Sequence, residues 1–481
     1  MNSNKVTGLV LAAGKGTRMK SAIPKVMHDL AGRPLIGHVL ASLNALEFTK
    51  ILVVVGHGRE QVTEYISQAG VQAEGGNLDI IVQRDQLGTA HAVQQALPYL
   101  PEGTVMVLSG DQPLLALDTL GALLETHRRC DAAATVLTAE MEDPSGLGRI
   151  VRGEGGCVAR IVEQKDADAE TQHIKEINTG TYCFQVEALR QALAHVRPNN
   201  VQQEYYLTDV FGYLTQKQRA VAAHKLTDPQ EAMGINDLYQ LSVAEEIYWE
   251  RMRRYWMREG VRMVRPSTIL IEGDVTLEAD VTLLPNTWLR GRSYIGRGSV
   301  IGPQTTLDTC RCGEKCVIEC SVAEEAVLGN GCHVGPFGRL RKGSVLENDA
   351  HVGNFVEIKN SIIGRASKAS HLSYIGDAEL GERVNVGAGT ITCNYDGAHK
   401  HKTLIGDGVF VGSNANLVAP VSIGAGATIG AGSTVTKDVP AEALALERAD
   451  QRMVSGWKTK IGVSKGSSQG AKRAGKAEKE K

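Results

Sequence analysis

An aliphatic residue followed by glycine recurs through the second half of this 481-residue chain. Several of these pairs are separated by six residues or by multiples of six. A six-residue period is typical of a parallel β-helix, in which three hexapeptides form one coil and the aliphatic side chains fill the core. We therefore expect a β-helix over residues 260–455 rather than a general glycine-rich β domain. The pairs are Ile301-Gly302, Val334-Gly335, Val352-Gly353, Ile363-Gly364, Ile375-Gly376, Val386-Gly387, Ile405-Gly406, Val411-Gly412, Ile423-Gly424 and Ile429-Gly430.

Residues 1–238 follow a different pattern, in which strand-like and helix-like segments alternate. The stretches "VTGLVL", "KILVVVG", "LDIIVQ" and "TVMVLSGD" are short and rich in β-branched residues, as buried strands are. The segments "PLIGHVLASLNAL", "GTAHAVQQALPYL" and "LDTLGALLETHRRC" have the apolar spacing of helices. This alternation predicts a mostly parallel α/β sheet with helices on both faces, and ligands bind such sheets beyond the carboxyl ends of the strands.

Two further segments complete the predicted organisation. The stretch from residue 236 to 260 has no proline and no internal glycine, so we expect one long amphipathic helix ending at Gly260, with 239–259 as a helical linker. The last stretch, 456–481, is polar and basic on balance, and we expect a disordered tail.

Charge and cysteine content argue against a nucleic-acid-binding, membrane or secreted protein. The formal net charge of −2 gives no support for a nucleic-acid partner, and we expect neither a membrane segment nor a secretory signal. The nine cysteines lack a disulfide framework and fit reduced thiols in a cytoplasmic protein. Four of them crowd into "CRCGEKCVIEC" (310–320); zinc sites use separated knuckles, so we favour ordinary thiols over a metal site there.

The stretch "LAAGKGTRMKSAIPKVM" (11–27) follows the first predicted strand and combines glycines with cations. A P-loop is excluded because Gly16 stands where its serine or threonine is needed, and a dinucleotide fingerprint is excluded because Met19 replaces its third glycine. Glycines still let backbone N–H groups approach an anion. The combination G-x-G-T-R-M followed by "PK" resembles the signature of sugar-phosphate nucleotidyltransferases.

Residues 6–455 as a whole resemble the bacterial bifunctional N-acetylglucosamine-1-phosphate uridyltransferase and glucosamine-1-phosphate acetyltransferase family. The motifs that carry the resemblance occur in the family's order: "LAAGKGTRM", "QLGTAHA", "GDQPLL", "INTGTY", "GPFGRLR", "HVGNFVEIK", "SHLSYIGDAE", "NVGAGTITCNYDG" and "VFVGSNANLVAPV". The resemblance implies a Rossmann-like mixed sheet followed by a left-handed parallel β-helix, assembled as a homotrimer. It also implies acetylation of glucosamine 1-phosphate by acetyl-CoA, then transfer of UMP from UTP to N-acetylglucosamine 1-phosphate. The product, UDP-N-acetylglucosamine, would supply peptidoglycan and lipopolysaccharide synthesis.

For the uridyltransferase site, the resemblance implies a nucleotide loop, phosphate cations and a magnesium pair. Nucleotidyl transfer needs positive charge around the phosphates, and Mg²⁺ favours a few hard oxygen ligands. Arg18 and Lys25 match the catalytic cations, and Asp111 and Asn236 match the metal ligands. The other matching UTP and UDP-sugar contacts are Leu11, Ala12, Ala13, Gly14, Gln83, Gly88, Thr89, Ser109, Gly110, Gly148, Glu163 and Asn178.

For the acetyltransferase site, the chemistry needs a base for the amine proton, and histidine suits that role. Spacing alone does not choose among His333, His351, His371, His399 and His401, but the motif "SHLSY" selects His371, with Glu357 to orient or polarise it. The resemblance places Arg341, Lys359, Tyr374 and Asn385 at the sugar phosphate. It places Ala388, Asn394, Tyr395, Ser413, Ala431 and Arg448 at acetyl-CoA, with Asn394 and Tyr395 also near the acceptor.

Two other readings stay open at this point. A monofunctional nucleotidyltransferase would use the β-helix for regulation and would not need His371, Arg341 or Lys359. A non-catalytic scaffold should have lost the glycine loop and Asp111. The chain departs from the family at Arg265, where aspartate is common, and at Gln112, where many relatives have valine; we expect neither to affect the chemistry. The cysteine run leaves the coil register near 310–320 uncertain.

Overall fold

The computed structural model describes residues 6–46, 48–68 and 78–457 and divides into two compact units, Met1–Gly343 and Ser344–Lys481. The predicted tail (456–481) lies almost wholly outside the described residues. Within the described part, no helix has the length and apolar character needed to cross a membrane.

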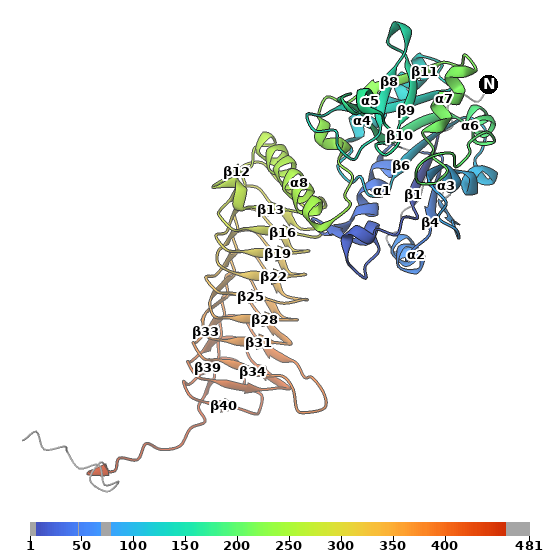
Figure 1. The fold of residues 1–481 in the computed structure, drawn as a ribbon. Helices are drawn as coiled ribbons and strands as arrows, with labels where there is room; N and C mark the ends of the chain where they lie inside the picture. Colours follow the sequence, from blue (N-terminus) through green and yellow to red (C-terminus); the bar gives the residue numbers. More distant parts are fainter. Residues whose placement is uncertain (1–5, 47, 69–77, 458–481) are drawn as a thin grey trace, which may run out of the picture. The chain divides into compact units, whose positions relative to one another are not determined.

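The first unit begins with a mixed α/β sheet in the strand order β11-β7-β10-β6-β1-β4-β5 (Figure 1). Neighbouring strands run parallel except that β10 is antiparallel to both β6 and β7, and β8 and β9 form an antiparallel extension. The strands are β1 (Val6–Ala12), β4 (Lys50–Val55), β5 (Leu78–Val82), β6 (Thr104–Ser109), β7 (Ala134–Glu140), β8 (Arg149–Arg152), β9 (Val158–Val162), β10 (Glu176–Gln185) and β11 (Val221–Lys225); a separate short pair is β2 (Asp29–Leu30) and β3 (Arg33–Pro34).

Helices cover both faces of this sheet, which explains why the central strands are mostly apolar. Along β1, Leu9 packs into one buried cluster and Val10 into the cluster on the opposite face. Alternate side chains of a strand point to opposite faces, so most side chains of a strand buried on both sides are apolar. The helices are α1 (Leu35–Ala45), α2 (Arg59–Gln68), α3 (Thr89–Ala96), α4 (Leu117–Arg129), α5 (Ala169–Gln172), α6 (Val186–Leu193) and α7 (Asp209–Gln216).

The predicted long helix is α8 (Leu238–Arg258), and it does more than connect two segments. Ala244 and Trp249 of α8 pack with Leu30, Leu35 and Leu114 in a third buried cluster. Helix α8 is therefore part of the core of the first unit, although its sequence predicted mainly a linker.

After α8 the first unit continues as coils of very short parallel strands. Each strand pairs in register with the strand one coil later, and its interior residue is usually aliphatic, as the hexapeptide pattern predicts. These strands form three ladders: β12 (Arg262–Met263), β15 (Thr282–Leu283), β18 (Val300–Ile301), β21 (Val317–Ile318) and β24 (His333–Val334); β13 (Leu270–Ile271), β16 (Trp288–Arg290), β19 (Thr306–Asp308), β22 (Val322–Glu324) and β25 (Arg339–Leu340); β14 (Thr276–Leu277), β17 (Tyr294–Ile295), β20 (Arg311–Cys312) and β23 (Val327–Leu328).

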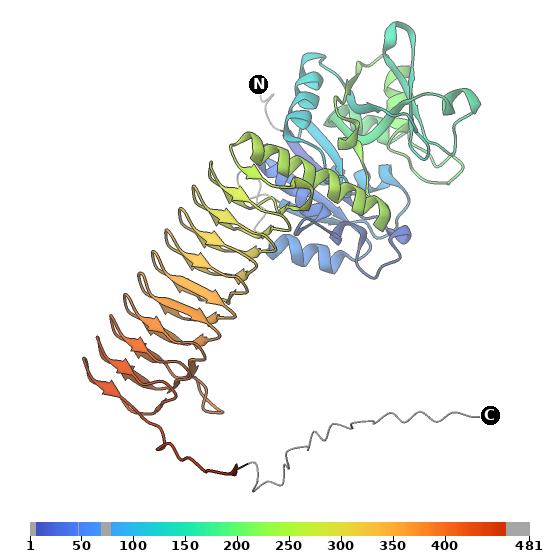
Figure 2. The same cartoon turned by 90° about the vertical axis from the view of Figure 1, so that its left-hand side faces the viewer.

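The second unit consists of coils of the same kind, which Figure 2 shows stacked along its length. Its ladders are β26 (Val345–Leu346), β29 (Ile362–Ile363), β32 (Ala378–Leu380), β35 (Thr403–Ile405) and β38 (Val421–Ile423); β27 (His351–Asn354), β30 (Lys368–His371), β33 (Asn385–Val386), β36 (Phe410–Val411), β39 (Thr428–Ile429) and β41 (Leu444–Ala445); β28 (Glu357–Lys359), β31 (Tyr374–Gly376), β34 (Ile391–Cys393), β37 (Asn416–Val418) and β40 (Thr434–Val435).

The cysteine run fits the coil register without distortion. Cys312 occupies the interior position of β20, in register with Ile295 on one neighbouring coil and Leu328 on the other. Cys310 and Cys316 are also fully buried, so these residues replace aliphatic side chains in the core. Within 6–46, 48–68 and 78–457, no three His, Cys, Asp or Glu side chains gather closely enough to hold a metal ion. Cys320, the last residue of the run, is only partly buried.

Candidate functional site

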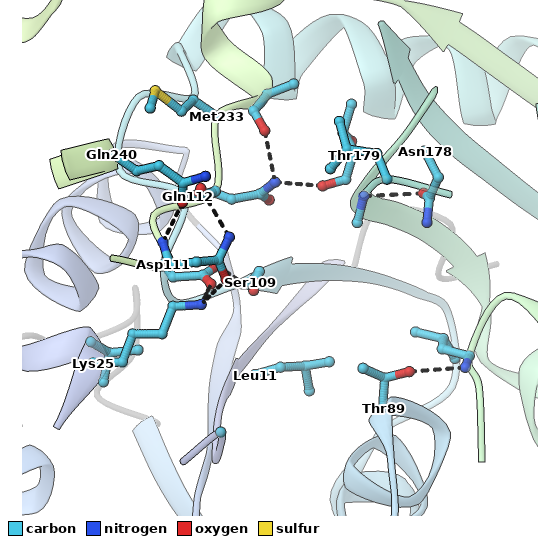
Figure 3. Close-up of a pocket in the computed structure, with 18 of the residues that line it drawn as sticks. Leu11, Lys25, Thr89, Ser109, Asp111, Gln112, Asn178, Thr179, Met233 and Gln240 are labelled. Carbon is cyan, nitrogen blue, oxygen red and sulfur yellow. Dashed lines mark hydrogen bonds and ion pairs between the residues drawn. The ribbon is translucent and has the colours of Figure 1, made fainter. Parts of the chain in front are cut away.

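A cleft of about 1070 Å³ opens at the carboxyl ends of β1 and β6 in the first unit (Figure 3). Strands β1 and β6 are parallel neighbours, so the loops that follow them meet at one edge of the sheet, as expected for this architecture. Thirteen of the predicted residues line this cleft: Leu11, Ala12, Ala13, Gly14, Lys25, Gln83, Gly88, Thr89, Ser109, Asp111, Glu163, Asn178 and Asn236.

The three remaining predicted residues of this site contact or adjoin residues that line the cleft. The Gly110 backbone N–H donates to the Leu11 carbonyl oxygen (2.9 Å), which joins the two strand ends. Gly148 lies beside Asn178 and Glu163, close enough that an added Cβ would be 3.4 Å from each side chain. Arg18 donates from Nη2 to Asn236 Oδ1 (2.8 Å). The structure therefore brings all of the predicted residues of the first site together.

Lys25 joins the two residues that were predicted as metal ligands. Its ammonium forms an ion pair with Asp111 Oδ2 and donates to Asn236 Oδ1 at 2.8 Å. Ser109 donates to the other Asp111 oxygen, Oδ1, at 2.6 Å. The side chains of Lys25 and Asp111 are only 14% and 16% exposed, so water screens this pair weakly.

Asp111 Oδ2 and Asn236 Oδ1, the two oxygens that contact Lys25, are suitable ligands for a magnesium ion. Both lie within reach of a single cationic atom, the Lys25 Nζ, so one cation can contact both. Mg²⁺ commonly takes one or two protein oxygens and completes its shell with water and substrate phosphate. A carboxylate oxygen with an amide oxygen satisfies that requirement.

The start of helix α8 determines the position of Asn236. Asp237 is the N-cap, and its carboxylate accepts the Gln240 backbone N–H (2.8 Å). The Gln240 side chain reaches back and accepts the Asn236 backbone N–H through Oε1 (2.8 Å). This reciprocal pattern resembles a capping box, which satisfies amide groups that a helix start leaves unpaired. Asn236 is thus held by a rigid helix end.

Gly16 is required because Lys25 approaches it closely. Its φ is +59°, and an added Cβ would lie 2.5 Å from the Lys25 Cβ. Gly14, in contrast, lines the cleft, and an added Cβ there would have nothing within 4 Å. Gly16 therefore allows the loop to bring Lys25 close to it, and Gly14 leaves its backbone open to a ligand.

Gln83, Gly88 and Thr89 form the opposite wall of the cleft, between β5 and the start of α3. Gln83 is buried and donates from Nε2 to the Gly88 carbonyl oxygen (3.3 Å). Gly88 has φ +121°, and an added Cβ would lie 2.5 Å from the Tyr205 carbonyl oxygen. Thr89 Oγ1 accepts the Leu207 backbone N–H (3.0 Å). This wall can tolerate no larger residue at position 88.

Asn178 and Glu163 line a third region of the cleft. Asn178 donates from Nδ2 to the Tyr182 hydroxyl oxygen (2.8 Å), and its Oδ1 accepts the Gly180 N–H (3.1 Å). Glu163 accepts from the Thr208 hydroxyl (3.1 Å). Burial raises the pKa of the Glu163 carboxyl, and nearby carboxylates raise it further, although the Thr208 hydrogen bond opposes this. These groups can bind hydroxyls of a sugar.

Sequence reasoning missed several residues that line the cleft. Gln240, Val243 and Ile247 come from the helix that was expected to be mainly a linker. Gln112 and Thr179 lie within the quoted motifs "GDQPLL" and "INTGTY", but neither was predicted as a site residue. The only sequence signal for the helix residues was their helical spacing after Asn236.

His371 lies at the end of β30 in the second unit, and its side chain is exposed. Strand register pairs Asn354 with His371, and Glu357 with Tyr374 on the next face. Glu357 and His371 are thus near the same corner of successive coils. The Ser373 hydroxyl donates to the His371 carbonyl oxygen (2.9 Å), which fixes the backbone after the histidine. Lys359 is in register with Gly376, one coil from the strand that carries Tyr374.

The predicted acetyl-CoA residues form a column on successive coils of the second unit. The Asn414 N–H donates to the Ala388 carbonyl oxygen (2.7 Å), and the Gly432 N–H donates to the Ser413 carbonyl oxygen (2.8 Å). Arg448 donates from Nη1 to the Ala431 carbonyl oxygen (3.1 Å). Three of these residues, Ala388, Ser413 and Ala431, have small side chains.

An enlarged loop carries Asn394 and Tyr395. Asn394 is buried and donates from Nδ2 to Asp377, whereas Tyr395 is exposed. Asp396 organises the loop by accepting the backbone N–H groups of Ala398 (2.8 Å) and His399 (2.6 Å). Asn385 is an exposed residue at the start of β33. Arg341 belongs to the first unit, two residues before its end.

The chain is similar to known proteins over nearly its whole length. A model of the MobA-like NTP transferase domain matches residues 8–203, and the bacterial transferase hexapeptide model matches residues 402–437 as six repeats. Bifunctional protein GlmU of Desulfitobacterium hafniense (strain DSM 10664 / DCB-2) is 49% identical over 450 residues, which cover 93% of this chain and 97% of that protein. The protein of the same name from Heliobacterium modesticaldum is 51% identical over 452 residues (94% and 97%), and that from Halalkalibacterium halodurans is 46% identical over 454 residues (94% and 98%).

Proposed function

The chain belongs to the family of bifunctional GlmU proteins, and we propose that its two chemistries use the cleft at β1 and β6 and the His371 region of the β-helix. It is a glucosamine-1-phosphate acetyltransferase and an N-acetylglucosamine-1-phosphate uridyltransferase, with acetyl-CoA and UTP as co-substrates. The monofunctional and scaffold readings of the sequence are therefore set aside.

For uridyl transfer, the cleft binds UTP with its uracil at Gln83, Gly88 and Thr89 and its phosphates at Lys25 and Arg18. A phosphate oxygen of N-acetylglucosamine 1-phosphate attacks the α-phosphorus of UTP, and the bond to the β-phosphate oxygen breaks to release pyrophosphate. Positive charge around the phosphates stabilises the charge that develops in this displacement. The observation that best supports this assignment is the meeting of Lys25 with Asp111 and Asn236 in one cleft.

We assign Asp111 and Asn236 as ligands of Mg²⁺. When bound, this ion supplies neutralising charge at the phosphates. We assign Leu11 to Gly14 to binding of the nucleotide. We assign Gly148, Glu163 and Asn178 to binding of the sugar and ribose. When ionised, the Glu163 carboxylate accepts hydroxyl hydrogen bonds at both of its oxygens, and protonation turns one of these oxygens into a donor.

For acetyl transfer, His371 accepts the proton as the glucosamine nitrogen attacks the thioester carbonyl carbon. The carbon–sulfur bond then breaks, and CoA leaves as the thiolate. The exposure of His371 leaves its ring accessible to a substrate, and Glu357 orients or polarises it. Arg341, Lys359, Tyr374 and Asn385 are assigned to the sugar phosphate, and Ala388, Asn394, Tyr395, Ser413, Ala431 and Arg448 to acetyl-CoA and the acceptor.

We propose that the protein works as a homotrimer in a reducing cytoplasm. Leu372, next to His371, is 63% exposed, and Phe410 in the same unit is 51% exposed, which favours burial against a second copy. None of the nine cysteines, all within the described residues, forms a disulfide, as a reducing compartment allows. Light scattering coupled to gel filtration measures the assembly directly, and a monomer at assay concentration would contradict it.

Paired assays on three variants test the site assignments. His371→Ala should lose CoA release and keep pyrophosphate release, whereas Asp111→Asn should do the reverse. His333→Ala, a partly exposed histidine on another coil that contacts Glu319, serves as the control and should keep both activities. Loss of both activities in His371→Ala with an intact fold, or normal CoA release by that variant, would contradict the assignment.

A further inference from the structure

Gln112, the residue after Asp111, is a buried part of the cleft wall, and both the nitrogen and the oxygen of its side-chain amide are hydrogen-bonded. It is 5% exposed. Its Nε2 donates to the Thr179 carbonyl oxygen and to the Ala232 carbonyl oxygen (3.3 Å). Its Oε1 accepts from the Thr181 hydroxyl (3.2 Å). One amide therefore connects three segments that are far apart in the sequence (Figure 3).

The first of these segments is an irregularity in β10. Along the β10–β7 ladder, Asn178 pairs with Thr138 and the next pair is Tyr182 with Val136, so β10 has extra residues between the two pairs. A bulge interrupts the ladder and leaves backbone groups that need other partners. Gln112 supplies a partner at Thr179, directly after Asn178. The amide thereby fixes the part of β10 that presents Asn178 to the cleft.

The second segment leads to Asn236. The Ala232 carbonyl oxygen accepts from Gln112, and the Ile235 N–H donates to the Asp111 carbonyl oxygen (3.0 Å). These two bonds hold the residues before Asn236 against residues 111 and 112. The uracil wall of the cleft, at β5 and α3, has no bond to this amide among the described contacts of Gln112.

We propose that Gln112 is a positioning residue for uridyl transfer. It sets the spacing between the Asp111–Asn236 pair and the sugar-binding Asn178 without contacting substrate. This inference rests on the proposed location of uridyl transfer in this cleft. A valine at this position could not make these bonds, so the role follows from the polar partners around the amide.

The geometry distinguishes this role from simple stabilisation, because Gln112 is tied to only part of the cleft. Loss of the amide should displace the acceptor sugar relative to the phosphates and leave uracil recognition in place. Misplacement of reacting groups by about 1 Å can lower a rate by roughly a hundredfold. We therefore expect kcat for uridyl transfer to fall at least tenfold, KM for N-acetylglucosamine 1-phosphate to rise, and KM for UTP to change little.

The test uses Gln112→Met, which keeps the volume of the side chain and removes its hydrogen bonds. Gln112→Glu keeps the shape and an acceptor but removes the donor. Gln94→Met is the matched control, because Gln94 is also partly buried and donates to a backbone carbonyl, Leu193 O (3.2 Å). All four proteins are assayed for both activities well below their unfolding temperatures, and CoA release by the same chain reports the intact β-helix.

The expected result is a selective loss of uridyl transfer in both Gln112 variants, with the split between the two KM values described above. Wild-type kinetics in Gln112→Met, or an equal rise in KM for UTP, would overturn the proposal. If wild-type protein releases CoA but no pyrophosphate, the proposed function of the cleft fails instead. If Gln112→Met does not fold, the kinetics of Gln112→Glu decide by the same criteria.

Discussion

Replacing Lys25 with methionine should tighten the binding of Mg²⁺ to the free enzyme. The Lys25 ammonium contacts Asp111 Oδ2 and Asn236 Oδ1, the two oxygens assigned to the metal. A metal ion that uses both oxygens must first displace the ammonium. Lys25 is therefore a competitor for the metal until UTP offers its phosphates as an alternative partner.

The expected size of the effect follows from these contacts. A hydrogen bond that involves charged groups contributes about 1.5–3 kcal/mol. The lower end applies here, because Arg18 remains in contact with Asn236 in the variant and because the pair is not fully buried. About 1.4 kcal/mol corresponds to a tenfold change in affinity, so the dissociation constant for Mg²⁺ should fall about tenfold.

Isothermal titration of Mg²⁺ into the enzyme without UTP measures this constant directly. Lys20→Met is the matched control, because Lys20 is an exposed cation of the same loop. It should bind Mg²⁺ like the wild-type protein. Uridyl transfer by Lys25→Met should be slower, since the phosphates lose a cation, so binding and activity should change in opposite directions. Equal or weaker Mg²⁺ binding by Lys25→Met would refute the competition.

Three further predictions concern other parts of the two sites. Gly88→Ala should lower the free energy of unfolding by about 1–3 kcal/mol in urea titrations, because a φ of +121° is accessible mainly to glycine and the new Cβ meets the Tyr205 carbonyl oxygen; an unchanged midpoint would contradict this. Burial raises the pKa of Glu163, so kcat/KM for uridyl transfer should decrease with falling pH, and this decrease should begin at a higher pH than for an ordinary glutamate. The pH profile of Glu163→Gln should lack this decrease; if the variant keeps it, another group is responsible. The backbone N–H of His399 and the His401 side chain lower the pKa of Asp396, so its contribution to loop stability is present above the ordinary aspartate pKa and is lost as pH falls through the lowered value. Asp396→Ala should raise KM for acetyl-CoA and leave pyrophosphate release unchanged; equal damage to both activities would show a general loss of folding.

The sequence predicted the architecture well because both halves follow strong local patterns. Strands such as β1 are mostly apolar because both faces are buried, and the β-helix repeats its interior position on every coil. The cysteine run obscured that repeat only because a thiol replaces an aliphatic side chain at Cys312. Size and burial matter at such a position more than the usual residue type.

The candidate site was predicted less completely, since some of its residues act through contacts that are distant in the sequence. Lys25 and Asn236 matched a motif, but the motif did not reveal that Lys25 contacts both predicted metal ligands. From the sequence we expected that glutamine at position 112 would not affect the chemistry, because its partners, Thr179 and Ala232, are 67 and 120 residues away. No local pattern encodes contacts of that kind, which depend on the whole sheet being formed.

The loop that carries Asn394 and Tyr395 shows how this scaffold can acquire new chemistry. Asn385 pairs with Phe410, 25 positions later, whereas Phe410 pairs with Thr428, only 18 positions later. The longer coil keeps its strand register, so the additional residues project from a corner and the interior ladder is undisturbed. Such corners are places where segments can be inserted, exchanged or shortened during evolution or by design, while the stacked core continues to fold as before.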